Sequence, residues 1–128
     1  MPAVAVKPIL LVDDDAIQLR IRQAILQDAG FTVDTATTAE AALALLHPSA
    51  RRNFGAVITD HLLSQGNGAE LVPQIRALLP DIPIVVITGL PGAEAEYEGW
   101  SIHFRQKPCP PEELIALVKS VTQLTDRG

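Results

Sequence analysis

Apolar runs of strand length alternate along this chain with stretches in which apolar residues recur every three to four positions. The runs cover residues 9–12, 31–36, 56–59 and 84–87, and a weaker fifth covers 102–104. The first, third and fourth runs are continuously apolar rather than alternating. This pattern predicts strands that are buried on both faces of a parallel sheet.

Helical periodicity occupies the intervals between these runs. In the first interval, four apolar residues recur at helical spacing before the helix-stopping Gly30: Ile17, Ile21, Ala24 and Ile25. Thr37 and Glu40 have the spacing of a capping box ahead of an Ala/Leu-rich helix over 39–46. Asn67 and Glu70 repeat that spacing before a third helix. These signals predict one helix after each of the first three strands.

The signal for the fourth helix is weak, whereas the signal for the last helix is strong. A short, weakly amphipathic helix is expected at about residues 93–98. Pro111 is suited to the first turn of a final helix, which carries one apolar stripe: Leu114, Leu117, Val118 and Val121. Five β-α units in succession predict an α/β fold with a doubly wound, five-stranded parallel sheet.

Length and composition limit the function classes. The 128 residues, 48% of them hydrophobic, predict one domain over 1–128, with a core from about 8 to 124 and short flexible termini. The net charge of −5, scattered basic residues and few aromatics argue against direct nucleic-acid binding. One cysteine, Cys109, and the lack of a signal-peptide pattern or membrane-span run predict a cytoplasmic protein.

Polar residues follow the predicted strands where each strand ends. Asp13, Asp14 and Asp15 follow the first, Asp60 the third, and Thr88 and Lys107 the fourth and fifth. Doubly wound sheets bind ligands at the carboxyl ends of their strands. Carboxylates brought together there repel, and Mg²⁺ with oxygen ligands relieves the repulsion. The alternative is a set of solvated acids and a helix cap. An acid cluster with a hydroxyl and an ammonium favours a site that handles a phosphoryl group, with a carboxylate as nucleophile.

The chain resembles the receiver domain of bacterial two-component response regulators, including the chemotaxis regulators. The matching segments are 11–15 (LVDDD), 59–68 (TDHLLSQGNG), 87–89 (ITG) and 107–108 (KP). The resemblance implies a (βα)5 flavodoxin-like fold with its strands in the order 2-1-3-4-5 in chain numbering. It also implies a regulatory domain that is not an enzyme in the ordinary sense, since only its own phosphorylation and dephosphorylation are self-catalysed.

The family's functional residues can be carried over to matching positions. Asp60 resembles the phosphoacceptor. Asp14, Asp60 and the backbone carbonyl of Leu62 resemble the direct Mg²⁺ ligands, and Asp13 resembles a ligand that acts largely through water. Mg²⁺ is the implied cofactor. Asp15 has no such role in the family, and its side chain is expected to cap the first helix.

The switch residues follow in the same way. Thr88 resembles the hydroxyl that follows the phosphoryl group, and Lys107 its charge partner, ahead of a peptide bond to Pro108 that is usually cis in the family. Phe104 resembles the rotating aromatic of the output face. Two residues after the phosphoacceptor and after the switch threonine, the family has positions that flank the path of the hydrolytic water; Leu62 and Leu90 stand there.

Several neighbours of these residues carry two interpretations. His61 is interpreted as a partly exposed residue that shapes access to Asp60, with a metal ligand or proton donor as the alternative. Tyr97 and Trp100 form either an exposed partner patch or core packing. Cys109, which stands where the family often has Phe, is interpreted as a small packing residue. Lys107 follows Thr88 by only 19 positions, which predicts a reduced fourth helix.

The resemblance implies a histidine kinase or phosphotransfer protein as donor. The downstream partner is expected to be a protein that docks on the fourth helix, fifth strand and fifth helix, with no nucleic acid and no membrane involved, and a homodimer stays an open alternative. Other interpretations are a receiver fragment of a hybrid kinase, a phosphorelay intermediate, or a binding module that takes no phosphate. A Mg²⁺-dependent aspartyl-phosphate phosphatase fits less well, because Ala16-Ile17 follows the acids where such enzymes carry Asp-x-Asp and a Gly-Thr.

Overall fold

The computed structural model describes residues 7–63 and 66–127, and within them five parallel strands form one sheet. The strands are β1 (Ile9–Val12), β2 (Val33–Ala36), β3 (Ala56–Asp60), β6 (Ile84–Thr88) and β7 (His103–Gln106). They lie in the order β2-β1-β3-β6-β7, which confirms the predicted order. A small antiparallel pair, β4 (Leu62–Leu63) and β5 (Gly66–Asn67), follows β3 and was not predicted from the sequence.

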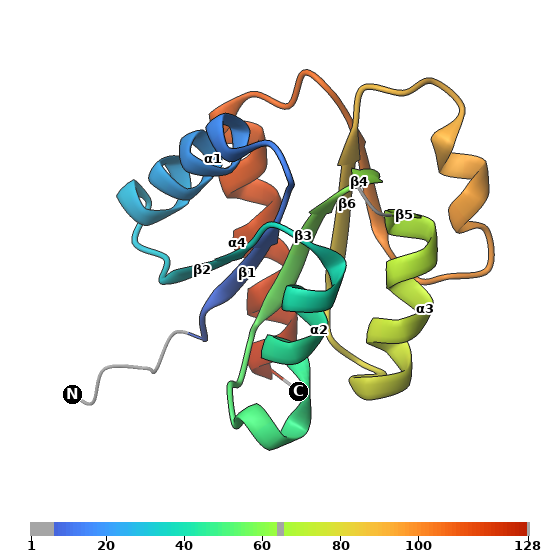
Figure 1. Cartoon of the computed structure of the whole chain (residues 1–128). Coiled ribbons are helices and arrows are strands. Elements are labelled where there is room, and N and C mark those ends of the chain that lie inside the picture. Colours follow the sequence, from blue (N-terminus) through green and yellow to red (C-terminus); the bar gives the residue numbers. More distant parts are fainter. Residues whose placement is uncertain (1–6, 64–65, 128) are drawn as a thin grey trace.

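Helices cover both faces of this sheet (Figure 1). The α-helices are α1 (Ala16–Asp28), α2 (Ala39–Leu46), α3 (Gly68–Leu78) and α4 (Pro111–Arg127). Two short 3₁₀ helices are η1 (Pro48–Ala50) and η2 (Ala93–Tyr97). Helices α1 and α4 pack on one face, and α2, α3 and η2 pack on the other. None of the helices in the described part of the chain is long and apolar enough to cross a membrane.

The two faces of the sheet support separate hydrophobic cores. Alternate residues of each central strand point to opposite faces, so Leu10 and Val12 of β1 face α2 and α3, whereas Ile9 and Leu11 face α1 and α4. All the residues of β1, β3 and β6 are buried. Burial on both faces explains why these three segments are continuously apolar in the sequence.

The structure corrects some of the predicted boundaries and faces. β2 begins at Val33 rather than at 31, and β7 spans His103–Gln106 rather than 102–104. In α1 the buried residues are Leu19 and Leu26, whereas Ile17 and Ile21 of the predicted stripe are exposed. The helix was therefore predicted correctly, but of the predicted stripe only Ile25 packs against the core.

Side-chain caps begin three of the helices. The Asp15 carboxylate accepts hydrogen bonds from the Ile17 and Gln18 amides, which confirms its predicted role as a cap. Asn67 and Glu70 form the predicted capping box of α3. For α2 the prediction was off by one residue: Thr38 rather than Thr37 is the cap, because its hydroxyl accepts from the Ala41 amide.

The segment between β6 and β7 is fastened by Tyr97. The expected short fourth helix is the 3₁₀ helix η2, and Tyr97 at its end is buried. Its hydroxyl lies 2.6 Å from Nδ1 of His61, and its ring centroid lies 5.9 Å from that of Phe104. A Cβ atom on Gly68 would overlap the Tyr97 hydroxyl, so this glycine leaves the space that the tyrosine occupies. Tyr97 thus ties η2 to the end of β3 and the start of α3.

We expect Tyr97→Phe to lower the free energy of unfolding by about 1–3 kcal/mol, because it leaves a buried imidazole nitrogen without its partner. Urea unfolding followed by circular dichroism measures the change. Trp100→Phe, a similar reduction of an exposed aromatic in the same segment, is the control and should stay within about 0.5 kcal/mol of the parent. Equal stability of Tyr97→Phe and the parent would show that this hydrogen bond does not fasten η2.

Candidate functional site

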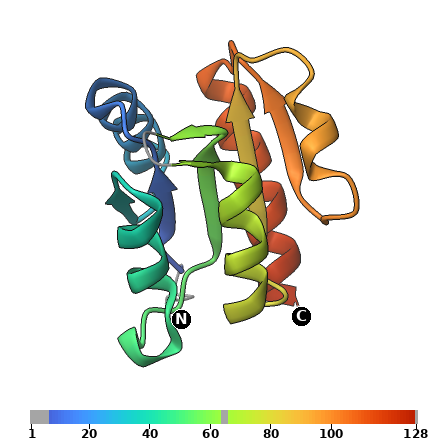
Figure 2. The same ribbon diagram turned by 45° about the vertical axis from the view of Figure 1, so that its right-hand side comes forward.

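The carboxyl ends of β1, β3 and β6 meet at one edge of the sheet, toward which their arrows point in Figure 2. Val12 of β1 is paired with Thr59 of β3, so the next residues, Asp13 and Asp60, stand side by side. Asp60 is paired with Ile87 of β6, and Thr88 is the following residue. The structure therefore brings Asp13, Asp60 and Thr88 together, as the sequence predicted from strand ends.

Asp60 is a mostly buried carboxylate with a lysine partner. It is 8% exposed, and Nζ of Lys107 donates to its Oδ2 at 2.9 Å. The Lys107 amide donates to the Thr88 carbonyl at 2.8 Å, which holds the lysine beside the end of β6. Oδ1 of Asp60 receives only a long contact of 3.4 Å from the Leu62 amide, beyond the usual range for such a bond. Oδ1 is therefore the less engaged oxygen of this carboxylate.

Asp13 is more deeply buried, at 2% exposure, and both of its oxygens are engaged. Oδ1 accepts from the Asp15 amide at 2.9 Å, and Oδ2 accepts from the Arg22 guanidinium at 2.9 Å. Burial raises the pKa of the Asp13 carboxyl above its ordinary value, and the charge of Asp60 raises it further. The Asp15 amide and Arg22 offset part of this rise. The raised pKa of Asp13 thus reflects first its burial and then the neighbouring carboxylate of Asp60.

The acids at the strand ends offer oxygen donors to a cation such as Mg²⁺. Within residues 7–63 and 66–127, no group of three or more acidic, histidine or cysteine side chains is arranged to hold a metal ion. Asp14 is exposed in the loop between β1 and α1, outside the buried pair of Asp13 and Asp60. Mg²⁺ usually takes one or two carboxylates and keeps several waters. The oxygen atoms of these three acids and of the Leu62 backbone are donors of the type that Mg²⁺ prefers, and the set fits the ion chemically.

The two predicted switch residues lie on adjacent strands. Thr88 is buried, and its hydroxyl oxygen accepts from the Leu90 amide at 3.1 Å. Phe104 is half-buried on β7 and packs against the core on the α2 and α3 face. The peptide bond between Lys107 and Pro108 is cis, as the resemblance implied.

The structure shows contacts that the sequence did not predict. His61 is 2% exposed, so the interpretation of a partly exposed residue was wrong. Its Nδ1 faces the Tyr97 hydroxyl, and its Nε2 lies 3.1 Å from a carboxylate oxygen of Glu96. The neutral tautomer with its proton on Nε2 satisfies both contacts. The contact between Arg22 and Asp13 was also not predicted from the sequence. The feature that pointed to it is the spacing of this basic residue, three positions after Leu19 and four before Leu26.

Of the two aromatics with open interpretations, Tyr97 is buried in the core and Trp100 is exposed. Cys109 is half-buried and packs against the core on the α1 and α4 face. Burial raises the pKa of its thiol, which fits a packing residue rather than a reactive one. Ser64, which stands where the family commonly has proline, lies outside the described residues.

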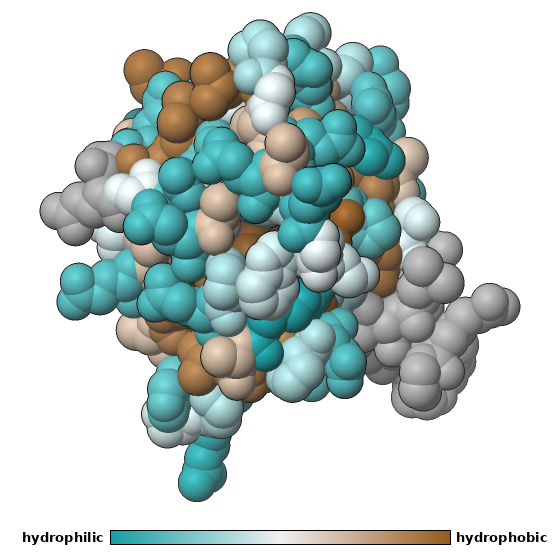
Figure 3. Space-filling view, turned by 90° about the vertical axis from the view of Figure 1, so that its right-hand side faces the viewer, coloured by the Kyte–Doolittle hydropathy of each residue, from teal (hydrophilic) through white to brown (hydrophobic). Residues whose placement is uncertain are grey.

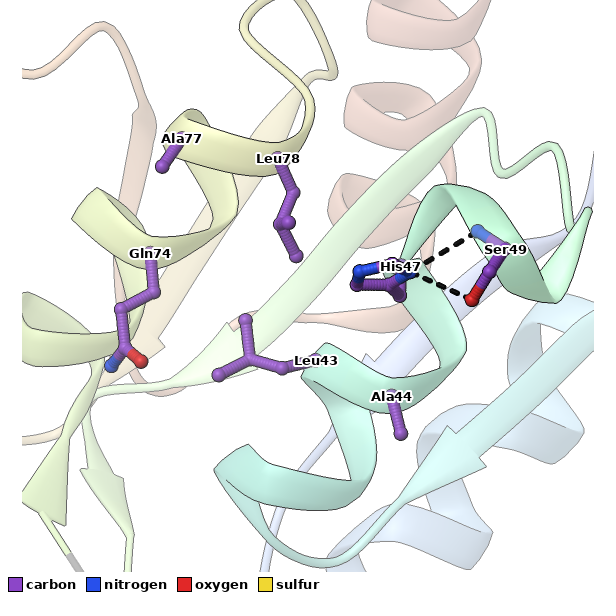
Figure 4. Close-up of a pocket in the computed structure, with 7 residues that line it drawn as sticks. All are labelled: Leu43, Ala44, His47, Ser49, Gln74, Ala77 and Leu78. Atoms are coloured by element: carbon purple, nitrogen blue, oxygen red, sulfur yellow. Dashed lines mark hydrogen bonds between the residues drawn. The ribbon is translucent and has the colours of Figure 1, made fainter.

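A separate pocket lies between α2 and α3, away from the acids (Figure 4). Leu43 and Leu78 point into it from the two helices. His47, at its rim, accepts from the Ser49 amide and pairs with the Ser49 hydroxyl. His47 is thereby the side-chain cap of η1. None of the predicted site residues lines this pocket.

Comparison with known proteins adds relatives of known class. The chain is 34% identical over 125 residues to the alginate biosynthesis transcriptional regulatory protein AlgB of Pseudomonas aeruginosa. The matched segment covers 93% of this chain and 27% of AlgB. It is 30% identical over 115 residues to the transcriptional regulatory protein FixJ of Bradyrhizobium diazoefficiens, and this match covers 88% of this chain and 55% of FixJ. The chain thus spans about a quarter to a half of the length of these curated relatives.

Solved structures agree with this fold. A CheY-like receiver domain protein from Methanospirillum hungatei superposes with a TM-score of 0.86 at 27% identity, covering 96% of this chain and 98% of that one. The chemotaxis protein CheY4 of Vibrio cholerae gives a TM-score of 0.79 at 28% identity, covering 91% and 99%. The model of the response regulator receiver domain family matches residues 9–119. The chain therefore belongs to the family of response regulator receiver domains.

Proposed function

We propose that this receiver domain takes a phosphoryl group onto Asp60 from a histidine kinase or a phosphotransfer protein, with Mg²⁺ as cofactor. The observation that carries the proposal is the pairing of Asp60 with Lys107 beside the second buried carboxylate, Asp13. A mostly buried carboxylate that keeps one oxygen weakly engaged is suited to nucleophilic attack. Receiver membership supports the same role, which is regulatory rather than enzymatic.

The chain's own residues account for much of the transfer chemistry. Oδ1 of Asp60 forms the new bond to phosphorus while the bond from phosphorus to the donor's histidine nitrogen breaks. Lys107, now bound to Oδ2 of Asp60, neutralises an oxygen of the arriving phosphoryl group. The Thr88 hydroxyl, which accepts from the Leu90 amide, donates its own proton to another oxygen.

Mg²⁺ is assigned to Asp14, Asp60, the Leu62 carbonyl and, through water, Asp13. When bound, it screens the carboxylates and the phosphoryl oxygens from one another. The carboxylates that would hold it follow the ends of two neighbouring strands, so the site depends on the pairing of β1 with β3.

Acetyl phosphate with Mg²⁺ should add one phosphoryl group to the protein, and mass spectrometry of the intact chain measures it. The label should be absent with EDTA and absent in Asp60→Asn, because both the cation and the nucleophile are required. Asp81→Asn, a matched change of an exposed aspartate, is the control and should label like the parent.

Two results would contradict the assignment. Labelling that persists in Asp60→Asn would place the phosphoryl group on another residue. Repeated release of phosphate from a small ester such as p-nitrophenyl phosphate would indicate a phosphatase instead.

We infer that phosphorylation shifts an equilibrium between two conformations through Thr88 and Phe104. A phosphoryl group adds about −1.5 to −2 charge and draws the hydroxyl and the ammonium toward it. Moving a population from 1:99 to 99:1 takes about 5.5 kcal/mol, and charge-assisted hydrogen bonds of roughly 1.5–3 kcal/mol each are of the size required. Thr88 and Phe104 lie on paired strands, β6 and β7, which supports this route.

The output surface is assigned to η2, β7 and α4. The face over η2 and β7 is mainly hydrophilic, with small separate hydrophobic areas (Figure 3). A hollow of about 420 Å³ there is bordered by acidic, basic and aromatic side chains: Glu94, Glu98, Trp100, Phe104 and Arg105. This mixture suits a protein partner rather than the phosphate backbone of a nucleic acid. The longer relatives are transcriptional regulators. The proposal of a protein target concerns only the receiver domain and not the remaining parts of those relatives.

The lifetime of the phosphoryl group depends on water reaching phosphorus from the side opposite the Asp60 oxygen. The Leu90 amide donates to the Thr88 hydroxyl oxygen, and the Leu62 amide lies 3.4 Å from Oδ1 of Asp60, so both leucines stand beside the site. Leu62 and Leu90 are 54% and 42% exposed, respectively. Neither side chain offers a hydrogen bond to a water molecule, and neither can therefore orient it for attack.

We expect Leu62→Asn and Leu90→Glu each to speed the loss of phosphate from Asp60 by about fivefold, the effect of one hydrogen bond of roughly 1 kcal/mol. The decay is followed by mass spectrometry after the donor is removed. Ile21→Asn, an apolar-to-polar change at an exposed position of α1, is the control and should leave the rate unchanged. Unchanged or slower decay in both leucine variants would contradict this account.

A further inference from the structure

Arg22 occupies an unusual position on α1. It is spaced three residues after Leu19 and four before Leu26, the two residues that α1 buries in the core. An amphipathic helix usually carries an apolar residue at such a position. The Arg22 side chain is only 12% exposed, whereas Arg20 on the same helix is exposed. A charge placed there needs a partner, because burying it alone is costly.

That partner is Asp13, one of the acids assigned to the metal site. NH1 of Arg22 donates to Oδ2 of Asp13 at 2.9 Å, and the Asp15 amide holds Oδ1 at 2.9 Å. Each oxygen of the Asp13 carboxylate thereby accepts one hydrogen bond from a group of this chain. A cation that uses Asp13, directly or through a water molecule, has to share or displace the contact with Arg22.

We propose that Arg22 is an internal counter-cation that neutralises Asp13 in the metal-free protein and competes with Mg²⁺ for it. This inference rests on the proposed Mg²⁺ site. A divalent cation beside the acids repels the guanidinium, so binding costs the contact between Arg22 and Asp13. Arg22 therefore weakens Mg²⁺ binding while it stabilises the metal-free fold. It acts as a positioning residue, through Asp13, and does not contact the phosphoryl group.

A role of Arg22 in orienting Asp13 for the metal would change Mg²⁺ affinity in the opposite direction. If Arg22 mainly orients the Asp13 carboxylate for the metal, its removal weakens Mg²⁺ binding. If it competes, its removal strengthens binding. The direction of the change in Mg²⁺ affinity thus decides between orientation and competition.

The test titrates MgCl₂ alone into the ¹⁵N-labelled protein and follows the backbone amides by NMR. Arg22→Gln should bind Mg²⁺ about fivefold more tightly than the parent, in the range of coupling between residues in contact. Arg20→Gln removes the same charge from an exposed position of the same helix and should stay within about twofold of the parent. In the Asp13→Asn background, Arg22→Gln should give no gain in affinity, because the competition requires the carboxylate.

Thermal unfolding gives a second readout. In EDTA, Arg22→Gln should unfold at a lower temperature than Arg20→Gln, since it leaves Asp13 buried without its cation. Saturating Mg²⁺ should raise the unfolding temperature of Arg22→Gln more than that of the parent. Arg22→Met keeps the packing of the side-chain stem and should show the same gain in Mg²⁺ affinity. It replaces Arg22→Gln in the titration if that variant folds poorly.

The outcomes distinguish this inference from the proposed function. If the parent and Arg20→Gln bind Mg²⁺ but Arg22→Gln and Arg22→Met bind it equally or more weakly, the site stands and the competition is overturned. If the parent binds no Mg²⁺ but Arg22→Gln does, the competition is supported in its strongest form. If no variant binds Mg²⁺, both the metal site and this inference are wrong.

Discussion

The carboxylates of Asp13 and Asp60 lie side by side at the ends of adjacent parallel strands, where the fold keeps two like charges almost out of water. Each acid has a cation from a different part of the chain: Arg22 from α1 for Asp13, and Lys107 from the end of β7 for Asp60. Removing either cation would leave a buried charge without compensation. The site therefore combines opposite charges from the ends of β1 and β3, from α1 and from the residue after β7, and each acid has its own cation.

Contacts made by residues next to the two acids lead from the site toward the protein surface. His61, the residue after Asp60, is held by Tyr97 and Glu96 of η2, and Tyr97 in turn lies beside Phe104 of β7. Thr88, at the end of β6, is paired with Gln106 of β7. Two physical connections thus lead from the end of β3, where Asp60 stands, to the surface formed by η2, β7 and α4. Packed elements of this kind have discrete arrangements rather than continuous ones, which suits a two-state response.

The sequence predicted the sheet and the position of the acids because both depend on local signals. Continuous apolar runs mark buried parallel strands, and the strand ends follow directly from where the runs stop. The burial of His61 could not be predicted, since its partner Tyr97 is 36 residues away. The buried face of α1 was predicted wrongly, because Ile17 and Ile21 suggest one stripe while Leu19 and Leu26, with Arg22 between them, form the real one. The burial of His61 and the buried face of α1 depend on contacts with distant parts of the chain, which the local periodicity does not show.

We propose that the charge at Asp60 controls the positions of η2 and β7. The most direct measurement compares the NMR spectra of the protein with Mg²⁺ alone and with Mg²⁺ and beryllofluoride, which imitates the phosphoryl group on the carboxylate. The account predicts shifts at Thr88, Tyr97 and Phe104 and at the Trp100 indole, with Leu43 in the pocket between α2 and α3 unmoved. Shifts confined to the residues beside Asp13 and Asp60, with η2 and β7 unchanged, would contradict it.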